Sequence, residues 1–387
     1  MSKLDELKEK RTLAVTQSIE IIEQTVKVEE PKKTKHSWIG TILLFIVIGI
    51  GIFLMFQISN ELGDNSIPFA EAIKKINIDY LLLSISIVLF FVGLVIFEFS
   101  ITLKIVTDKF NLLLATRVAL IGKFYDYVTP MASGGQPMEI YEIHKKGYSG
   151  GVSTAVALAR WCIHIFSWLL ITMIYLIIGK DYLVSSFESG AAITTILILT
   201  WLGWGVTIIL PITLILFLIM PKLALKLARF GISIGAYFKF IKDEDRTYNK
   251  VVCTLNELRN CFITITKRPF YFVTLILISL LEVVVLYTVP YFAILVFNSD
   301  QGFNFNELIK ISLLNSYATC SAAIIPTPGN SGALESTASL IFKGVGGGIL
   351  SWVILLYRFL TYYIFLLVGI IVNIVKFIKS LFKKKEI

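Results

Sequence analysis

The sequence predicts an all-α, multi-pass membrane protein, and two observations support this prediction. Of its 387 residues, 56% are hydrophobic and 16% are charged, whereas a soluble globular protein has about 25% charged residues. Several uninterrupted apolar segments also exceed the roughly 20 residues that an α-helix needs to cross a bilayer. These features exclude a soluble enzyme, a secreted disulfide-bonded scaffold and a disordered chain.

Six apolar segments are long enough to span a membrane. The predicted spans are 39–58, 80–103, 152–178, 191–219, 271–297 and 346–375. They define an integral membrane domain over 39–375. The charged segment 1–38 has no signal-peptide pattern and is interpreted as a solvated cytoplasmic tail, and 376–387 is a second, basic tail.

The distribution of Lys and Arg predicts the orientation of the chain, because basic residues collect on the cytoplasmic side. Eight basic residues lie in 1–38, ten in 221–270 and five after Val375, against two in 60–79, one in 180–190 and none in 298–304. Both termini and the connection 221–270 are therefore expected at the cytoplasmic face of the cell membrane. The net charge of +9 is explained by anionic lipid and gives no reason to expect a nucleic-acid partner.

Two further apolar stretches, 110–149 and 305–345, do not fit as simple spans. Each starts with a helical pattern, breaks at Pro and Gly residues, and then resumes. The first lies between two cytoplasmic ends and the second between two external ends, so each must cross an even number of times. We expect two re-entrant hairpins that line a central cavity, because broken backbone at membrane depth needs protein or water around it.

The two hairpins resemble each other in sequence. The first break reads P-M-A-S-G-G-Q-P-M-E and ends at Glu139, and the second reads P-T-P-G-N-S-G-A-L-E and ends at Glu335. An arginine follows each acid within the next predicted span. Together these features predict an inverted-topology repeat, with repeat A at about 80–178 and repeat B at about 271–375, and a site near mid-membrane. The residues expected to break the helices are Pro130, Gly134, Gly135, Pro137, Pro326, Pro328, Gly329 and Gly332.

Charged side chains within the predicted spans are the main functional signal, since an intramembrane charge is costly unless it is paired or hydrated. Arg160 and Arg358 lie too deep in their spans to reach an interface easily. One interpretation is that their guanidinium groups bind lipid phosphate. The other is internal ion pairing, in which the candidate partners are Glu139 or Glu98 for Arg160, and Glu335 or Glu282 for Arg358. The sequence leaves both interpretations open.

Three other polar residues are weaker candidates. Arg117 and Lys123 lie on the first arm of hairpin 110–149, where an amphipathic helix at the interface with solvated charges is favoured over a role in the translocation pathway. His164 falls one turn after Arg160, and we interpret it as a hydrogen-bonded core residue rather than a proton relay.

No catalytic or metal-binding motif is recognisable. The chain has no G-x-S-x-G, H-E-x-x-H or Walker sequence, only three histidines, and four cysteines without a C-x-x-C pair. No metal, no cofactor and no ATP-driven transport are therefore expected.

The segments G-K-F-Y-D-Y-V-T-P-M-A-S-G-G-Q-P and I-P-T-P-G-N-S-G-A-L-E, the latter followed by Y-R-F-L-T-Y-Y, resemble the lysylphosphatidylglycerol synthase transmembrane family over about residues 40–375. This family includes the flippase half of the multiple peptide resistance factor. The resemblance implies that the Pro, Gly, Glu and Arg residues of both breaks are motif positions. Only about 12 residues follow the last predicted span, so we expect no synthase domain.

By this resemblance the expected function is movement of an anionic or aminoacylated phospholipid, such as lysyl-phosphatidylglycerol, between leaflets. Such movement would lower negative surface charge and contribute to resistance against cationic antimicrobial peptides. Two alternatives remain: a membrane-embedded transferase, such as the membrane part of a phosphatidylglycerol lysyltransferase system, or a subunit that presents lipid to a separate synthase protein.

Overall fold

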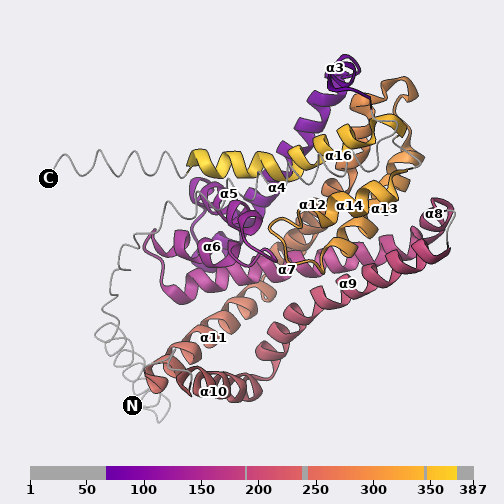
Figure 1. The fold of residues 1–387 in the computed structure, drawn as a ribbon. Coiled ribbons are helices and arrows are strands. Elements are labelled where there is room, and N and C mark those ends of the chain that lie inside the picture. The colour runs from indigo at the N-terminus through magenta and orange to yellow at the C-terminus, as the bar shows by residue number, and fades with distance from the viewer. Residues whose placement is uncertain (1–66, 188–189, 238–242, 344–346, 373–387) are drawn as a thin grey trace, which may run out of the picture. The chain divides into compact units, whose positions relative to one another are not determined.

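The computed structural model describes residues 67–187, 190–237, 243–343 and 347–372 (Figure 1). All described residues belong to one compact unit. The described residues form helices and their connections, with no β-strand among them. The predicted span 39–58 and both predicted tails lie outside the described residues.

Five helical segments are long and apolar enough to cross a membrane, and they coincide with five of the six predicted spans. They are α4 (Ile78–Thr107), α7 (Gly150–Ile178), α9 (Gly190–Ile219, apolar enough over Gly190–Thr213), α12 (Pro269–Phe297) and the run Leu350–Val372. Each of the first four has 29 or 30 residues, which at 1.5 Å per residue gives about 45 Å. The protein is thus an all-α membrane protein.

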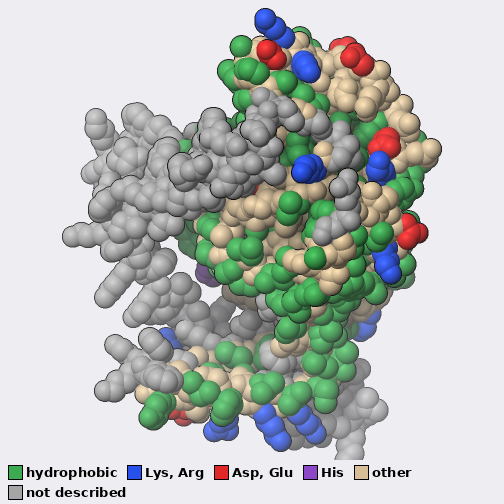
Figure 2. Space-filling view, turned by 45° about the vertical axis from the view of Figure 1, so that its right-hand side comes forward, with side chains coloured by type: hydrophobic (Ala, Val, Ile, Leu, Met, Phe, Trp, Pro, Cys, Tyr) green, Lys and Arg blue, Asp and Glu red, His purple; other side chains and the backbone are tan. Residues whose placement is uncertain are grey.

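The outward faces of these helices are apolar. Leu89 and Phe90 on α4, Ile177 on α7, Ile209 on α9 and Leu277 on α12 are all more than half exposed. Figure 2 shows hydrophobic side chains widely over the described surface in this view, with Lys and Arg side chains at its upper end, on its right side and at its lower edge. A water-soluble protein rarely exposes so much contiguous apolar surface, whereas a lipid-facing one must.

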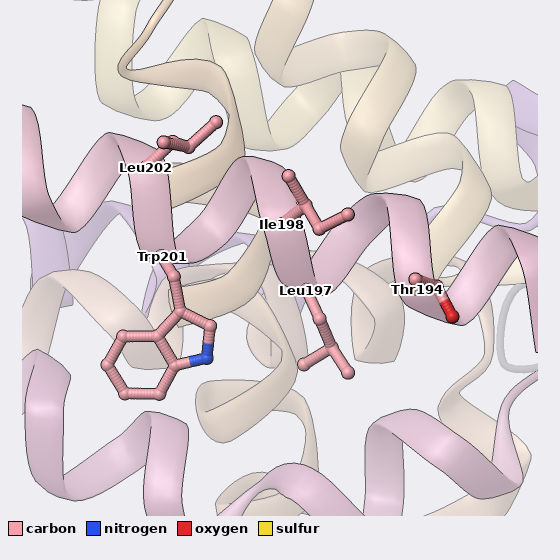
Figure 3. A pocket seen from close by; sticks show the side chains of 5 residues that line it. All are labelled: Thr194, Leu197, Ile198, Trp201 and Leu202. Carbon is pink, nitrogen blue, oxygen red and sulfur yellow. The ribbon is translucent and has the colours of Figure 1, made fainter.

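An apolar groove of about 510 Å³ lies on α9 (Figure 3). It is lined by Thr194, Leu197, Ile198, Trp201 and Leu202. The threonine hydroxyl already donates to the carbonyl of Gly190, one turn earlier. The lining therefore offers apolar contact without charged groups.

Two helix pairs occupy the stretches predicted as hairpins. The first is α5 (Leu112–Val128) and α6 (Gly135–His144), and the second is α13 (Phe305–Ala322) and α14 (Ala333–Ile341). Within each pair the two helices pack against each other. The predicted pattern of a helix, a break and a second helix is therefore present in both stretches.

The predicted basic connection is also helical. It contains α10 (Pro221–Tyr237) and α11 (Glu244–Thr266), and α11 packs against α7. Asp243 begins α11 by accepting a hydrogen bond from the backbone N–H of Arg246 at 2.9 Å. Short helices α3 (Phe69–Lys74) and α8 (Lys180–Ser185) lie in the other loops, and α16 (Leu350–Arg358) begins the last apolar run.

Helices α9 and α13 approach each other closely at Gly203. A Cβ atom at this position would overlap the carbonyl oxygen of Cys320, a backbone atom that cannot rotate away. Thr200 and Ser321 hydrogen-bond across the same interface at 2.8 Å. Small residues of this kind allow membrane helices to pack backbone to backbone.

Gly203→Ala is therefore expected to push α9 away from α13 and to lower the free energy of unfolding by about 1–3 kcal/mol. Gly205→Ala on the same helix is the matched control, because a Cβ there meets nothing within 4 Å. Thermal unfolding of the two purified variants in detergent compares them. Equal unfolding temperatures would show that the close approach does not constrain the fold.

Candidate functional site: two buried arginine centres

Arg160 on α7 is surrounded by three carboxylates from three other helices, and we name this group the Arg160 centre. Its Nε lies 2.9 Å from Oε2 of Glu98 on α4. Its two terminal nitrogens lie 3.9 Å from Oε1 of Glu139 on α6 and 3.9 Å from Oε2 of Glu282 on α12. Arg160 is 5% exposed, and none of the three carboxylates exceeds 2%. The centre therefore joins both predicted repeats around one cation.

Neighbouring groups complete the Arg160 centre. The guanidinium lies over the ring of Phe99, 4.3 Å from its centroid. Ser279 donates a hydrogen bond of 3.0 Å to Oε1 of Glu98. Nδ1 of His164 lies 3.1 Å from Oε2 of Glu282. Glu98, His164 and Glu282 present potential metal-ligand atoms within 4.8 Å of one another, a set the sequence analysis did not anticipate.

Arg358, at the end of α16, has a different environment, which we name the Arg358 centre. Its Nε donates to Oε1 of Glu335 at 2.7 Å, and its Nη2 donates to the carbonyl of Gly329 at 2.9 Å and to the Ser331 hydroxyl at 3.2 Å. The guanidinium stacks over Tyr362, 4.5 Å from the ring centroid. One carboxylate thus balances one guanidinium, and the remaining contacts are to the second break itself.

Glu335 also fixes the start of α14. Its Oε2 accepts a hydrogen bond of 2.8 Å from the backbone N–H of Gly332, the residue before the helix. A carboxylate at this position satisfies an unpaired N–H group and interacts favourably with the helix dipole. Arg358, Glu335 and the second break therefore form one satisfied structural unit. A π-helical turn, Phe359–Tyr363, follows Arg358 directly, a departure from regular helix that the sequence did not predict.

The two breaks meet each other. Pro130 and Pro328 form an isolated antiparallel bridge. Beside it the hydroxyl of Tyr362 donates to the carbonyl of Tyr127 at 3.3 Å, and the two rings lie 5.3 Å apart. Segments about 200 residues apart in the chain thus touch at their helix breaks.

The strained backbone of the first break is not at its glycines. Gly134 has φ −92° and donates its N–H to the Thr129 hydroxyl, and Gly135 is the first residue of α6. Positive φ falls instead on Met131 (55°) and Ala132 (52°). A left-handed conformation costs a non-glycine residue roughly 1–2 kcal/mol, so the contacts of this break maintain strain. In the second break the glycines do adopt positive φ, at Gly329 (57°) and Gly332 (84°).

Glycine is needed at two break positions for close approach. A Cβ on Gly135 would overlap the carboxylate of Asp126, and one on Gly329 would overlap the ring of Tyr362. Proline serves a different purpose at Pro137, where it occupies the first turn of α6, in which its missing N–H has no helical partner.

Of the remaining predicted residues, Arg117 and Lys123 make contacts outside the two arginines' ion pairs, whereas His164 belongs to one centre. Arg117 forms an ion pair of 2.6 Å with Glu142, and a third of its side chain is exposed. Lys123 lies with its ammonium 5.5 Å from the centroid of the Phe91 ring. His164 is a partner of Glu282 and belongs to the Arg160 centre.

Sequence reasoning missed Ser279 and Tyr362 as neighbours of the arginines. Ser279 lies three residues before Glu282 and so on the same helix face, a signal that could have identified it. Tyr362 follows Arg358 by four residues, the same kind of spacing. That Glu282 faces Arg160 rather than Arg358 could not be read from spacing, because it depends on how α4 and α12 pack.

Neither arginine faces an open pocket among those that the described residues form. Both arginines are buried, at 5% and 3% exposure, among the carboxylates and helix breaks that surround them. The 510 Å³ groove on α9 touches neither. Ion pairs join the helices here, and both guanidinium groups are shielded from solvent.

Comparison with known proteins supports a family assignment. A family model described as "Lysylphosphatidylglycerol synthase TM region" matches residues 38–369. A comparison with curated proteins found no match. The matched region covers most of the chain and includes both breaks and both arginine centres. The chain belongs to the lysylphosphatidylglycerol synthase transmembrane family.

Proposed function

We propose that this protein is a lipid translocator of the cell membrane, which moves an anionic or aminoacylated phospholipid such as lysyl-phosphatidylglycerol between leaflets. Membership of the family supports the substrate class. The observation that carries the proposal is the Arg160 centre, a cation among three buried carboxylates contributed by three different helices. Charge of this kind inside a membrane domain is costly and marks a pathway or site.

The proposed topology is six spans and two re-entrant hairpins in an inverted repeat, with both termini cytoplasmic. Two contacts support it. Glu98 and Glu282, which have equivalent places in the two predicted repeats, face each other, and the two breaks meet at Pro130 and Pro328. A pseudo-two-fold axis between the repeats would bring equivalent segments together in this way.

In the proposed cycle the headgroup enters the Arg160 centre. The lipid phosphate takes the place of a carboxylate on the guanidinium, and an ammonium of an aminoacyl headgroup pairs with the carboxylate released. The acyl chains stay against the apolar outer faces, where the α9 groove offers a hydrocarbon surface. Movement of one break against the other would open the centre to each leaflet in turn.

The Arg358 centre has a supporting role in this proposal. Its Nε and Nη2 atoms are already engaged, because Arg358 donates to Glu335, Gly329 and Ser331 together. It keeps the second break rigid while the Arg160 centre changes partners.

Reconstitution in liposomes tests the function. Purified protein should move lysyl-phosphatidylglycerol, phosphatidylglycerol or both from one leaflet to the other faster than empty liposomes do, with phosphatidylcholine as the neutral comparison. Lipid movement no faster than in empty liposomes would refute translocation. Conversion of phosphatidylglycerol in the presence of a separate synthase would then favour the alternative, a membrane part or lipid-presenting subunit of a lysyltransferase system.

Native cysteines on α11 test the proposed orientation. Cys253 is exposed, whereas Cys261 is buried and its burial raises the pKa of the thiol to about 12. Since the thiolate is the reactive form, a membrane-impermeant maleimide should label Cys253 and leave Cys261 unmodified. Labelling is expected from the cytoplasmic side only and should vanish in Cys253→Ala but persist in Cys261→Ala. Labelling of Cys253 from the outside would show that the proposed orientation is wrong.

A further inference from the structure

Glu98 and Glu282 form a carboxyl pair in the interior of the domain. Both are fully buried, and a carboxylate oxygen of one lies within 4.8 Å of a carboxylate oxygen of the other. Two ionised carboxylates cannot hydrogen-bond, because neither carries a donor. A single proton shared between them would supply that donor, and like-charged carboxyls at close range commonly share one.

The charges around this pair leave negative charge in excess. The groups that face it are Lys123 from α5, Glu139 from α6, Arg160 and His164 from α7, and Ser279 from α12. With histidine neutral and every carboxyl ionised, three acids (Glu98, Glu139 and Glu282) oppose two cations (Lys123 and Arg160), which leaves −1. The Arg358 centre, with one acid and one arginine, has no such excess. Excess charge in the interior is neutralised by protons or by a bound cation.

The two members of the pair differ in their surroundings. Oε1 of Glu98 accepts a hydrogen bond of 3.0 Å from the Ser279 hydroxyl, and its Oε2 lies 2.9 Å from Nε of Arg160. Glu282 has only His164 at 3.1 Å and Arg160 at 3.9 Å near Oε2, and its buried Oε1 accepts no hydrogen bond from any described residue. The unsatisfied oxygen points to Glu282 as the member that carries the proton.

We propose that Glu98 and Glu282 share one proton, and that this pair binds and releases it during lipid movement. In uptake, a proton from water adds to the Glu282 carboxylate and forms an O–H bond that donates to Glu98. In release, that bond breaks and the proton passes to the imidazole of His164, whose side chain is 22% exposed, and from there to water. The coupling half of this inference rests on the proposed function, whereas the shared proton does not.

A divalent cation is the competing ligand for the same atoms. Glu98, His164 and Glu282 have suitable chemistry, but Arg160 already occupies one oxygen of Glu98 and would repel a metal at that position. A proton satisfies the unpaired oxygens without displacing the guanidinium.

Charge-neutral variants of the pair test the shared proton on the purified full-length protein. Glu282→Gln should retain the thermal stability of the wild type at neutral pH, because glutamine is a neutral isostere with a donor. Glu98→Gln should lose stability clearly, because Arg160 loses its nearest carboxylate.

The infrared C=O band of a protonated carboxyl should weaken in Glu282→Gln and stay unchanged in Glu307→Gln, a control at a surface ion pair with Lys310. Equal destabilisation by the two variants, or an unchanged band in Glu282→Gln, would overturn the proposal. The proposal would also be overturned if the purified wild type contained a bound metal ion that was absent from Glu282→Gln.

Coupling is tested in liposomes that contain a trapped pH-sensitive dye. A lipid gradient should drive proton movement through the wild type, and Glu282→Gln should move lipid without moving protons or fail to move either. Lipid movement by the wild type without proton movement would overturn the coupling and leave the translocator intact. Absence of lipid movement would instead refute the proposed function, while the infrared result still decides whether the proton is present.

Discussion

Arg358→Ala is expected to lower the free energy of unfolding by about 3–5 kcal/mol and to reduce the amount of folded protein in the membrane. The substitution leaves the Glu335 carboxylate buried at 2% exposure without its cation. It also removes the donors to the Gly329 carbonyl and the Ser331 hydroxyl, which hold the second break. Yield and thermal unfolding in detergent measure this effect.

The double variant Arg358→Ala with Glu335→Ala separates ion pairing from substrate binding. Removal of both charges should recover much of the lost stability, since no uncompensated charge remains. Arg358→Lys should be more stable than Arg358→Ala but less stable than the wild type. An ammonium keeps the charge but lacks the planar fork that reaches three acceptors at once. The contrary outcome is an Arg358→Ala variant that folds like the wild type and loses only lipid movement. That result would contradict the structural role and indicate that Arg358 contacts the headgroup.

Arg160→Ala is expected to reduce lipid movement more than it reduces the amount of folded protein, the opposite of Arg358→Ala. Arg160 is outnumbered by its carboxylates, which can take up protons when the cation is lost, so the loss of folded protein should be smaller than for Arg358→Ala. Lipid movement should fall much further. Loss of a charge-assisted contact with a headgroup phosphate costs about 1.5–3 kcal/mol, or roughly a ten- to hundredfold loss of affinity.

Arg268→Ala is the matched arginine control for both variants. Its side chain is 38% exposed and pairs at 3.0 Å with Asp108, which is itself largely exposed. Surface pairs of this kind contribute at most about 1 kcal/mol. Stability and lipid movement should therefore stay close to wild-type values. If Arg268→Ala lost as much lipid movement as Arg160→Ala, the effect of Arg160 would come from general positive charge and not from its position.

The sequence was sufficient to predict where the long helices lie, because bilayer thickness and hydropathy constrain them strongly. The predicted span 80–103 is extended in the structure to Ile78–Thr107 by an Asn77 cap at one end and a left-handed Asp108 at the other. The breaks were predictable for a similar local reason, since Pro and Gly interrupt helices wherever they cluster. The sequence offered Glu335 and Glu282 as alternative partners of Arg358, and the structure pairs it with Glu335.

Tertiary packing decided what the sequence could not. Glu282 was an alternative partner for Arg358, yet it faces Arg160 because α12 packs along α4. Met131 and Ala132 take the left-handed backbone that glycine usually takes, because the bridge between Pro130 and Pro328 holds the first break in place. Such contacts join segments far apart in the chain, and local residue preferences carry no information about them.

The measurement that tests the central claim most directly is leaflet-resolved lipid movement in liposomes that contain equal amounts of folded protein. Wild type and Arg268→Ala should move lysyl-phosphatidylglycerol or phosphatidylglycerol at the same rate, well above empty liposomes. Arg160→Ala should fall toward the rate of empty liposomes, by roughly ten- to hundredfold if the headgroup affinity controls transport. Equal rates for Arg160→Ala and the wild type would contradict the account, because the lipid would then cross without the Arg160 centre.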